Sequence, residues 1–381
     1  MNRELKPLTG IRGIAALLIA AYHFTITKAG NLEHIVSVER AYLAVDAFFV
    51  LSGFVLALSY AKSFSGGVGA KQYRSFLLKR FLRIYPAYFC ILLLYVAKLV
   101  VNVSGDGALA QFSVLDFISN LLMLNTWAID AKTIIGPSWS VCVEIFCYFL
   151  FPGMIAVIAR TRASAIATIV IALLGIIVVA LSGHGAGGEL DVVFGDTFYP
   201  VLRAVSGFSI GIAGYYLWAN TKLVTDTGSG AYLSLALIGM VAAIASGASD
   251  LLVYVFIAAA VILTATQSAA SQALFGNPVS HFLGKVSYSL YLIHTLLISI
   301  FVKFVPLLTP KIGYAAAYIS TLLFYLAFSV VAAAVSYSLF EVRARKLLEA
   351  LIFRPVPAAA ALTEIAAIIE NPAGAEPPVA P

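Results

Sequence analysis

The sequence predicts an all-α membrane protein: a polytopic bundle of about ten transmembrane helices, with amphipathic helices lying in the membrane interface. Of its 381 residues, 61% are hydrophobic and only 11% are charged, whereas soluble domains carry roughly 25% charged residues. Apolar stretches of about 20 residues, the length that crosses the hydrocarbon layer, recur between residues 8 and 339. These observations exclude a soluble single-domain enzyme.

The apolar stretches define the predicted spans. They lie near residues 8–27, 42–61, 86–103, 138–158, 163–182, 198–219, 231–248, 251–267, 286–305 and 313–339. The first follows MNRELKPLTG without a small-residue cleavage pattern, so we expect a retained span and not a signal peptide. Placing the N-terminus inside puts most Lys and Arg residues near one face, which is typical of the cytoplasmic side. Both termini are therefore expected in the cytoplasm.

Two amphipathic segments are expected to lie in the interface without crossing. Residues 73–85, YRSFLLKRFLRIY, alternate aromatic and aliphatic with basic side chains on the inner side, and residues 112–128 form a similar segment on the outer side. Residues 1–345 thus form one transmembrane domain, and 346–381 a cytoplasmic tail. The tail is expected to be disordered after about residue 355, since it is rich in Pro and Ala.

The net charge of +6 is explained by topology, so no nucleic-acid partner is expected. The three cysteines, Cys90, Cys142 and Cys147, lie in apolar stretches without metal-ligand spacing. They are interpreted as buried structural thiols, and no metal site is predicted.

Ionisable side chains inside spans are costly and mark function by default. They are Arg12, His23, Asp46, Glu144, Arg203 and His294. Counting residues at 1.5 Å each places four of them, His23, Asp46, Glu144 and Arg203, in one layer roughly 6–9 Å below the outer surface. This layer is predicted to be an outward-facing reaction site. The alternative is a set of structural polar contacts between helices, such as an Asp–Arg pair.

On the inner side, Arg80 and Arg83 lie three residues apart in KRFLRIYP and can share one helix face. Guanidinium groups match phosphate oxygens, so the pair suits phosphate binding. Anchoring to anionic lipid headgroups is the equally open alternative. Arg12 and Glu341 lie at the inner ends of the first and last predicted spans, where they serve the same inner site or pair with each other.

Six sequence elements, in this order, resemble one known family. They are R-x10-H from Arg12 to His23; VDAFFVLSGFVLA with Asp46, Ser52 and Gly53; the R-x-x-R of KRFLRIYP; WSVCVEIFCYFLFP with Trp139, Ser140 and Glu144; LGKVSYSLYLIH with Gly284, Ser287, Tyr288, Tyr291 and His294; and the terminal Phe340–Glu341. The chain thereby resembles the acyltransferase-3 family of multipass membrane O-acyltransferases, from about residue 5 to residue 345.

The resemblance implies transfer of an acyl group, usually acetyl and sometimes succinyl, to a hydroxyl of a bacterial cell-surface polysaccharide or its lipid-linked precursor. Acyl-CoA, most often acetyl-CoA, is the implied donor substrate, and no cofactor is permanently bound. The implied location is the bacterial inner membrane, in contact with lipids and with polysaccharide biosynthesis proteins. Many relatives carry a fused extracytoplasmic domain, so this chain is expected to act alone or with a separate partner.

Roles follow for the candidate residues. His23 is the expected general base, because its pKa lies near neutrality, and Asp46 or Glu144 would orient its ring. Donor binding is assigned to Arg12, Arg80, Arg83, Tyr291 and His294, and acceptor binding to Trp139, Ser140 and Arg203. Aromatic residues near the outer interface, among them Trp127, Trp139 and Tyr199, are either sugar-stacking surfaces or ordinary belt residues.

Two other classes of function fit parts of the sequence. In a proton-coupled transporter or flippase, the buried His23, Asp46 and Glu144 would form a proton relay, but the sequence has no evident repeat of the kind such proteins show. A structural subunit of an export complex would leave the buried charges unexplained.

Overall fold

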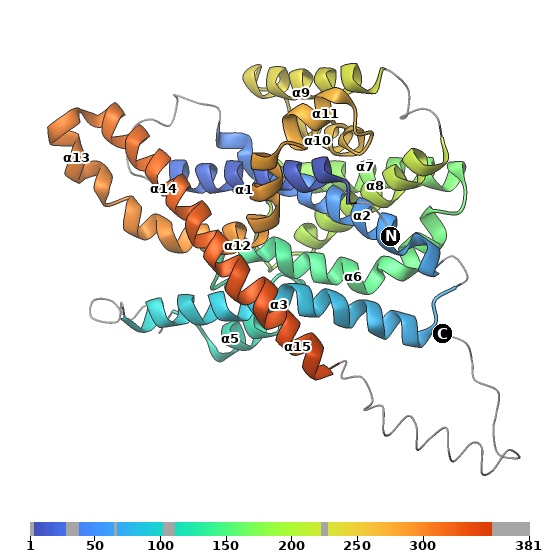
Figure 1. Ribbon diagram of the computed structural model, residues 1–381, viewed down its shortest axis with the longest axis horizontal. Coiled ribbons are helices and arrows are strands. Elements are labelled where there is room, and N and C mark those ends of the chain that lie inside the picture. The colour runs from blue at the N-terminus through green and yellow to red at the C-terminus, as the bar shows by residue number, and fades with distance from the viewer. Residues whose placement is uncertain (1–3, 28–37, 65–66, 102–110, 222–227, 353–381) are drawn as a thin grey trace, which may run out of the picture.

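The computed structural model describes residues 4–27, 38–64, 67–101, 111–221 and 228–352, and within these ranges every regular element is helical. Figure 1 shows the arrangement. The helices are α1 (Lys6–Ile26), α2 (Ala44–Phe64), α3 (Ala70–Val101), α5 (Val114–Leu121), α6 (Trp139–Ile158), α7 (Arg162–Leu181), α8 (Tyr199–Asn220), α9 (Ser229–Ala245), α10 (Asp250–Thr264), α11 (Ala269–Phe275), α12 (Pro278–Phe301), α13 (Phe304–Ile312), α14 (Tyr314–Ser336) and α15 (Arg345–Ile352).

The all-helical membrane fold is confirmed, but the count of about ten spans is not. A helix covers most of each predicted span. Seven helical stretches of the described chain are long and apolar enough to cross a membrane, or eight if α10 and α11, bent by 104°, form one broken span. α9 is shorter, and polar and glycine residues together with Arg203 dilute the apolar content of α8.

Glycines allow the core helices to pack closely against one another. A Cβ on Gly13 of α1 would lie 2.4 Å from the backbone nitrogen of Gly284 of α12, and one on Gly53 of α2 would lie 2.0 Å from the carbonyl oxygen of Phe208 of α8. Glycine has no side chain, so two helices can approach closely at these positions. Such packing is important in a membrane, because lipid supplies no hydrophobic force that would hold the helices together. Gly53 and Gly284, both within the family-like elements, therefore fix the frame on which the polar residues sit.

Helix α3 corrects the prediction of a separate interfacial helix at residues 73–85. One helix of 32 residues runs from Ala70 to Val101 with Pro86 inside it. At 1.5 Å per residue it is about 48 Å long, whereas the hydrocarbon core is about 30 Å thick. The helix is therefore longer than the hydrocarbon layer is thick, and Arg80 and Arg83 lie in its first half.

On the outer side, the segment 112–128 contains one short helix, α5. Ser113 caps it by accepting a hydrogen bond from the backbone N–H of Asp116, and the Asp116 carboxylate accepts one in return from the N–H of Ser113. Val114, Leu115 and Ile118 are exposed on its surface. An amphipathic helix with an uncovered apolar face is the form expected at a membrane interface.

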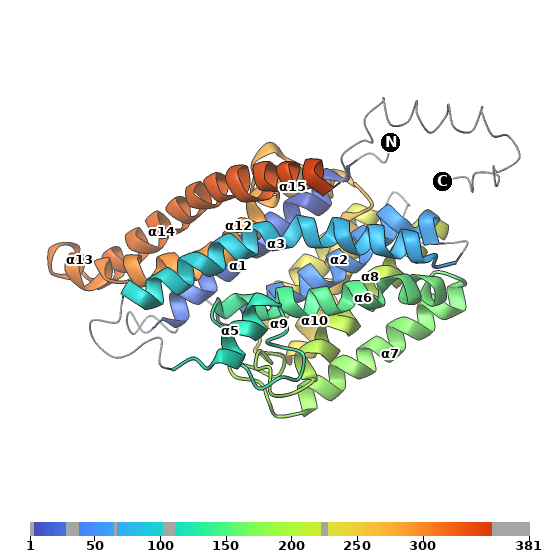
Figure 2. The same ribbon diagram turned by 90° about the horizontal axis from the view of Figure 1, so that it is seen from below.

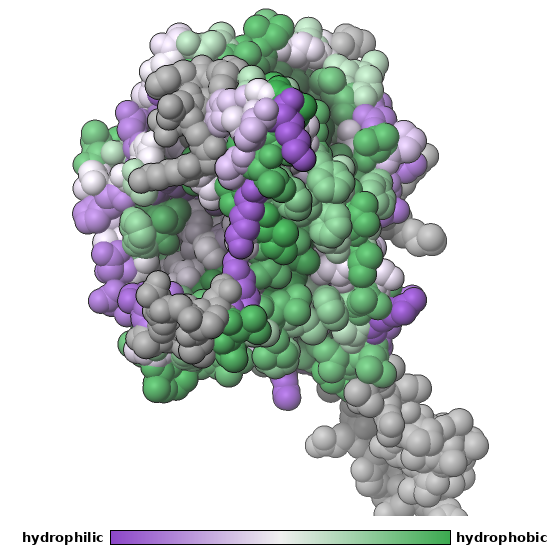
Figure 3. All heavy atoms as spheres, turned by 90° about the vertical axis from the view of Figure 1, so that its left-hand side faces the viewer, coloured by the Kyte–Doolittle hydropathy of each residue, from purple (hydrophilic) through white to green (hydrophobic). Residues whose placement is uncertain are grey.

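Figure 2 shows α3 and α6 running along the long axis of the molecule and α7 packed at the margin. Exposed large apolar side chains recur on α7 and α14, among them Ile171, Leu174, Leu323 and Val331. Figure 3 shows hydrophobic residues over much of one end of the molecule, with hydrophilic residues at both margins and in a narrow strip between them. Exposed apolar surface on this scale is expected where lipid replaces water.

The C-terminal helix is continuous across the predicted domain boundary at residue 345. α14 passes into a π-helical segment, η4 (Tyr337–Ala344), and then into α15, which ends at Ile352. The predicted disordered tail after residue 355 lies outside the described residues. π-Helical turns are rare and frequently occur at functional sites. Here the π segment carries Glu341.

Candidate active site

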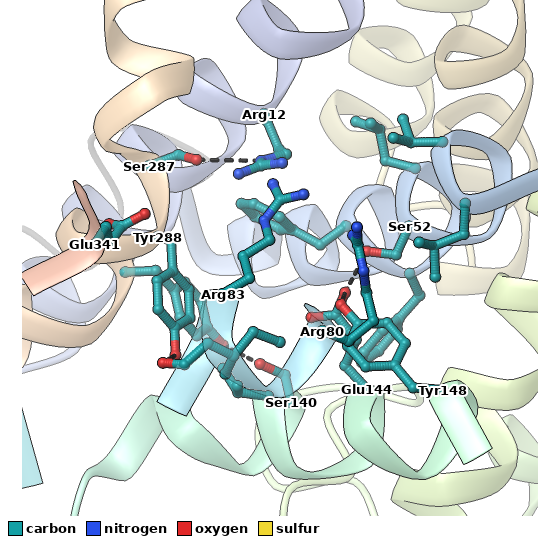
Figure 4. Close-up of a pocket in the computed structure, with 18 residues that line it drawn as sticks. Arg12, Ser52, Arg80, Arg83, Ser140, Glu144, Tyr148, Ser287, Tyr288 and Glu341 are labelled. Atoms are coloured by element: carbon teal, nitrogen blue, oxygen red, sulfur yellow. Dashed lines mark hydrogen bonds between the residues drawn. The ribbon is translucent and has the colours of Figure 1, made fainter. Parts of the chain in front are cut away.

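A cavity within the helix bundle brings together three predicted donor-binding arginines. Arg12 of α1 and Arg80 and Arg83 of α3 line it, with about 820 Å³ of space not filled by protein atoms. Figure 4 shows their guanidinium groups directed into this space, which we term the arginine pocket. The remaining lining residues are Phe48, Phe49, Leu51, Ser52, Val55, Leu56, Ile84, Ser140, Val141, Glu144, Tyr148, Ser287, Tyr288, Tyr291 and Glu341.

The arginines are held by neutral partners. Arg12 Nε donates to Ser287 Oγ at 3.2 Å, and Arg80 Nη2 donates to the hydroxyl of Tyr60 at 3.1 Å. Arg80 Nε is buried without a hydrogen-bond partner. Within the described part of the chain, none of the three forms a salt bridge with a carboxylate. The pocket therefore carries a net positive charge, with three guanidinium groups against the carboxylates of Glu144 and Glu341, and such an environment favours an anionic ligand.

Two carboxylates line the pocket but are engaged by hydroxyls. Ser52 and Tyr148 donate to Glu144 Oε1, Tyr148 at 2.7 Å, and Ser289 donates to Glu341 Oε1 at 2.6 Å. Glu144 was expected at the depth of His23, but it faces the arginine pocket instead. Counting residues along the helix did not give the direction in which the Glu144 side chain points.

Tyr291 and Ser140 also line the arginine pocket and contact each other. Their hydroxyl oxygens lie 2.7 Å apart in a hydrogen bond. Tyr291 was assigned to the donor and Ser140 to the acceptor, and both line this cavity. One helical turn further along α12 lies His294, whose ring centroid is 6.0 Å from that of Tyr291. Tyr291 thus separates the arginine pocket from the histidines.

His23 and His294 form a pair. His294 Nε2 lies 3.2 Å from His23 Nδ1, with the ring centroids 4.9 Å apart. His294 is fully buried, and His23 is partly exposed. Asp46 and Glu144 are absent from the hydrogen bonds described for His23, so neither carboxylate has the orienting position expected for it.

The backbone fixes the tautomers of the pair. His23 Nδ1 lies 3.0 Å from the carbonyl oxygen of Ile19, and His294 Nδ1 lies 3.2 Å from that of Leu290. Carbonyl oxygens only accept hydrogen bonds, so each Nδ1 carries the hydrogen when the rings are neutral. His294 Nε2 is then an acceptor for His23 Nδ1–H. The lone pair of His23 is left on Nε2, the nitrogen available to take a proton.

Asp46 and Arg203 are bound to each other. Arg203 Nε and Nη2 donate to the two carboxylate oxygens of Asp46 at 2.9 and 2.6 Å, and both side chains are fully buried. Trp139 covers the guanidinium at 5.4 Å from its ring centroid. Trp139 is only 6% exposed, so its ring is packed in the bundle and does not form an open sugar-stacking surface.

Several residues of the site were missed by sequence reasoning. Tyr60 and Tyr148, which hold Arg80 and Glu144, carry no charge and lie in apolar stretches. Their hydroxyls gave no signal because tyrosine is common in membrane spans. Ser289, the partner of Glu341, lies one residue after Tyr288 in the element LGKVSYSLYLIH and was not singled out.

Known proteins similar to this chain support the resemblance. A family model described as an acyltransferase domain matches residues 6–341. Acyltransferase MdmB of Streptomyces mycarofaciens is 33% identical over 160 residues, covering 39% of this chain and 38% of its own. A Staphylococcus aureus (strain COL) protein provisionally named an O-acetyltransferase is 27% identical over 332 residues, covering 78% of this chain and 51% of its own.

Protein 2 in the picA locus of Rhizobium radiobacter is 42% identical over 95 residues, covering 24% of this chain and 44% of its own. The chain therefore spans about half the length of these relatives, or less. No solved structure matches it. The family model covers nearly all of the described helices, including every arginine and histidine of the site. The chain therefore belongs to the acyltransferase-3 family, and its described part has seven helical stretches, or eight, that are long and apolar enough to cross a membrane.

Proposed function

We propose that the protein transfers an acetyl group, or a succinyl group, from cytoplasmic acyl-CoA to a hydroxyl of a cell-surface polysaccharide or its lipid-linked precursor. The observation that carries the proposal is the position of the arginine pocket. Three guanidinium groups without a described salt-bridge partner line it together with Tyr291, which lies one helical turn before His294. A ligand with an anionic head and a long neutral arm suits this shape.

The inner end is the donor side in this proposal. Arg12, Arg80 and Arg83 bind phosphate oxygens of CoA, since guanidinium groups form the strongest hydrogen bonds with such acceptors. His23 lies eleven residues beyond Arg12 on α1, about 16 Å along the helix. The narrow pantetheine arm extends over this distance and passes Tyr291 and Ser140, whose hydrogen bond opens to admit it.

His23 acts as the general base at the outer end. Its Nε2 takes the proton of the acceptor hydroxyl as the hydroxyl oxygen attacks the thioester carbonyl. The tetrahedral intermediate collapses, the C–S bond breaks, and the departing sulfur of CoA takes the proton back from His23 Nε2. His294 replaces Asp46 and Glu144 as the group that holds the ring, because its Nε2 accepts the hydrogen bond from His23 Nδ1. It stabilises the imidazolium as a neutral acceptor.

The acceptor approaches from the opposite side of the membrane. A location in the bacterial inner membrane, with the N-terminus and the arginine pocket on the cytoplasmic side, is supported by the gathering of Lys and Arg near that face. The name of the staphylococcal relative supports an O-acetyl product. Polysaccharide biosynthesis proteins and membrane lipids are the partners that this location implies.

The donor-binding role of the arginines predicts a loss of affinity. Arg80→Ala and Arg83→Ala should each weaken binding of acyl-CoA by about 10- to 150-fold, because a charge-assisted hydrogen bond contributes about 1.5–3 kcal/mol. Lysine at either position should restore only part of the loss, since it lacks the planar fork of donors. Titration of labelled acetyl-CoA into the protein in nanodiscs measures this.

Arg74→Ala is the matched control, because Arg74 lies on the same helix but is exposed and outside the pocket. It should bind acetyl-CoA like the wild type. Wild-type affinity in both the Arg80 and Arg83 variants would assign these residues to lipid anchoring and remove the basis for the donor site.

A further inference from the structure

A second cavity lies beside the arginine pocket, and nothing above assigns it a ligand. It contains about 960 Å³ of space not filled by protein atoms and is open to the surface. The start of α1, the first turns of α12, and η4 with α15 line it. Arg12, Arg83 and Glu341 line both cavities. We term this second space the η4 cavity.

The η4 cavity is basic, and its carboxylates are already engaged. Glu4 accepts a hydrogen bond from His281 at 3.0 Å, which holds the pKa of Glu4 below its ordinary value, and another from Thr9. Glu349 pairs with Arg345 at 2.8 Å, and Glu341 is bound by Ser289. These partners leave the basic side chains of the cavity in excess.

Two lysines carry this excess at the open end. Lys285 of α12 and Lys346 of α15 line the cavity and are exposed. In the part of the chain that the structure describes, neither forms a salt bridge. Flexible ammonium groups without a fixed partner suit a mobile phosphate at a cavity mouth. Tyr337, at the start of η4, adds a half-buried aromatic ring to the wall.

The residues that line both cavities place the two spaces next to each other, so that one long ligand can occupy both. A ligand that occupies both lies against Arg12, Arg83 and Glu341, and its anionic centre belongs beside the two guanidinium groups, since Glu341 is bound by Ser289. One end then enters the arginine pocket toward Tyr291, and the other lies among Lys285, Lys346 and Tyr337. CoA has this order of groups: a pantetheine arm, a diphosphate, and an adenosine that carries a 3′-phosphate.

We propose that the η4 cavity binds the 3′-phosphorylated adenosine of CoA, with Lys285 and Lys346 on the 3′-phosphate and the diphosphate between Arg12 and Arg83. This inference rests on the proposed function and specifies its donor site. The π-helical segment forms part of the cavity wall and carries Glu341, whose Oε1 accepts a hydrogen bond from Ser289. A protein built in this way selects CoA over the same molecule without the 3′-phosphate.

Competition between acetyl-CoA and acetyl-dephospho-CoA tests the inference. The wild type in nanodiscs should bind acetyl-CoA at least about 10-fold more tightly, as expected for one lost charge-assisted contact. The Lys285→Ala/Lys346→Ala variant should bind both compounds with the affinity that the wild type has for the dephospho form. Because its affinity for acetyl-dephospho-CoA would equal that of the wild type, the same measurement shows that the variant is folded.

Lys71→Ala is the control for loss of positive charge, since Lys71 is exposed at the start of α3 and lines neither cavity. It should keep the wild-type preference. Equal binding of both compounds by the wild type would overturn the inference while leaving the proposed donor intact. A preference that survives in the double variant would also overturn it, because the 3′-phosphate would then lie elsewhere. Binding of neither compound would contradict the proposed donor itself.

Discussion

Replacing His23 by alanine is expected to lower acyl transfer by about 10²- to 10⁴-fold, the usual effect of removing a positioned general base. Affinity for acyl-CoA should persist, because His23 lies outside the arginine pocket. Turnover of labelled acyl-CoA by the purified variant, beside its binding constant, measures both quantities. The expected pattern is a large fall in kcat with little change in donor affinity.

His184→Ala is a suitable control, since His184 is exposed on the loop after α7, has its described hydrogen bonds within its own turn, and contacts Tyr199 by its ring, away from the arginine pocket. Variants of His294, the partner of His23, test whether this contact holds the ring of the base. His294→Gln retains a side-chain acceptor for His23 Nδ1–H, so it should keep more activity than His294→Leu. Near-normal turnover by His23→Ala would contradict this mechanism and make His294 the candidate base.

The second large effect concerns stability. Arg203→Ala leaves the fully buried Asp46 without its partner, and breaking a buried pair in this way costs about 3–5 kcal/mol. The variant should unfold at a distinctly lower temperature in detergent. Replacing both residues by leucine should recover much of the loss, because no unpaired charge remains. Thermal unfolding followed by size-exclusion chromatography measures the difference.

Asp46→Asn tests the same pair from the other side. The amide removes the charge but keeps the size, so it should also destabilise the protein, and activity should fall in proportion to the folded fraction. A fully stable Asp46→Asn or Arg203→Ala protein that has lost acyl transfer would contradict a structural role. It would return these residues to the reaction site that the sequence predicted.

The positions of the helices could be predicted because apolar length is a local property. Each of the ten predicted spans has a helix at its position, and α7, nearly apolar throughout, was predicted at 163–182 and runs from Arg162 to Leu181. α3 was divided in error, because Pro86 after a basic segment is typical of a boundary. The helix continues through Pro86. Packing against the other helices of the bundle decides this, and such packing cannot be read from a local sequence pattern.

The site was predicted in part for a similar reason. Counting residues gives the height of a side chain along its helix, and Arg12, Arg80 and Arg83, which we expected on one side of the membrane, line one pocket. It does not give the direction around the helix. The partners of three side chains were therefore not predicted. Glu144 faces the arginines, Asp46 faces Arg203, and His23 faces His294. The π segment that places Glu341 gave no sequence signal.

Transfer across a sealed membrane tests the central claim most directly. The purified protein is reconstituted into vesicles, labelled acetyl-CoA is supplied only on the face that carries the arginine pocket, and a lipid-linked or free glycan only on the other. The account predicts labelled O-acetyl esters on the glycan, found by mass spectrometry, and none with His23→Ala. Uptake or export of glycan without ester formation would contradict the account and favour a transporter, if the vesicles with protein also bind acetyl-CoA no better than vesicles without it.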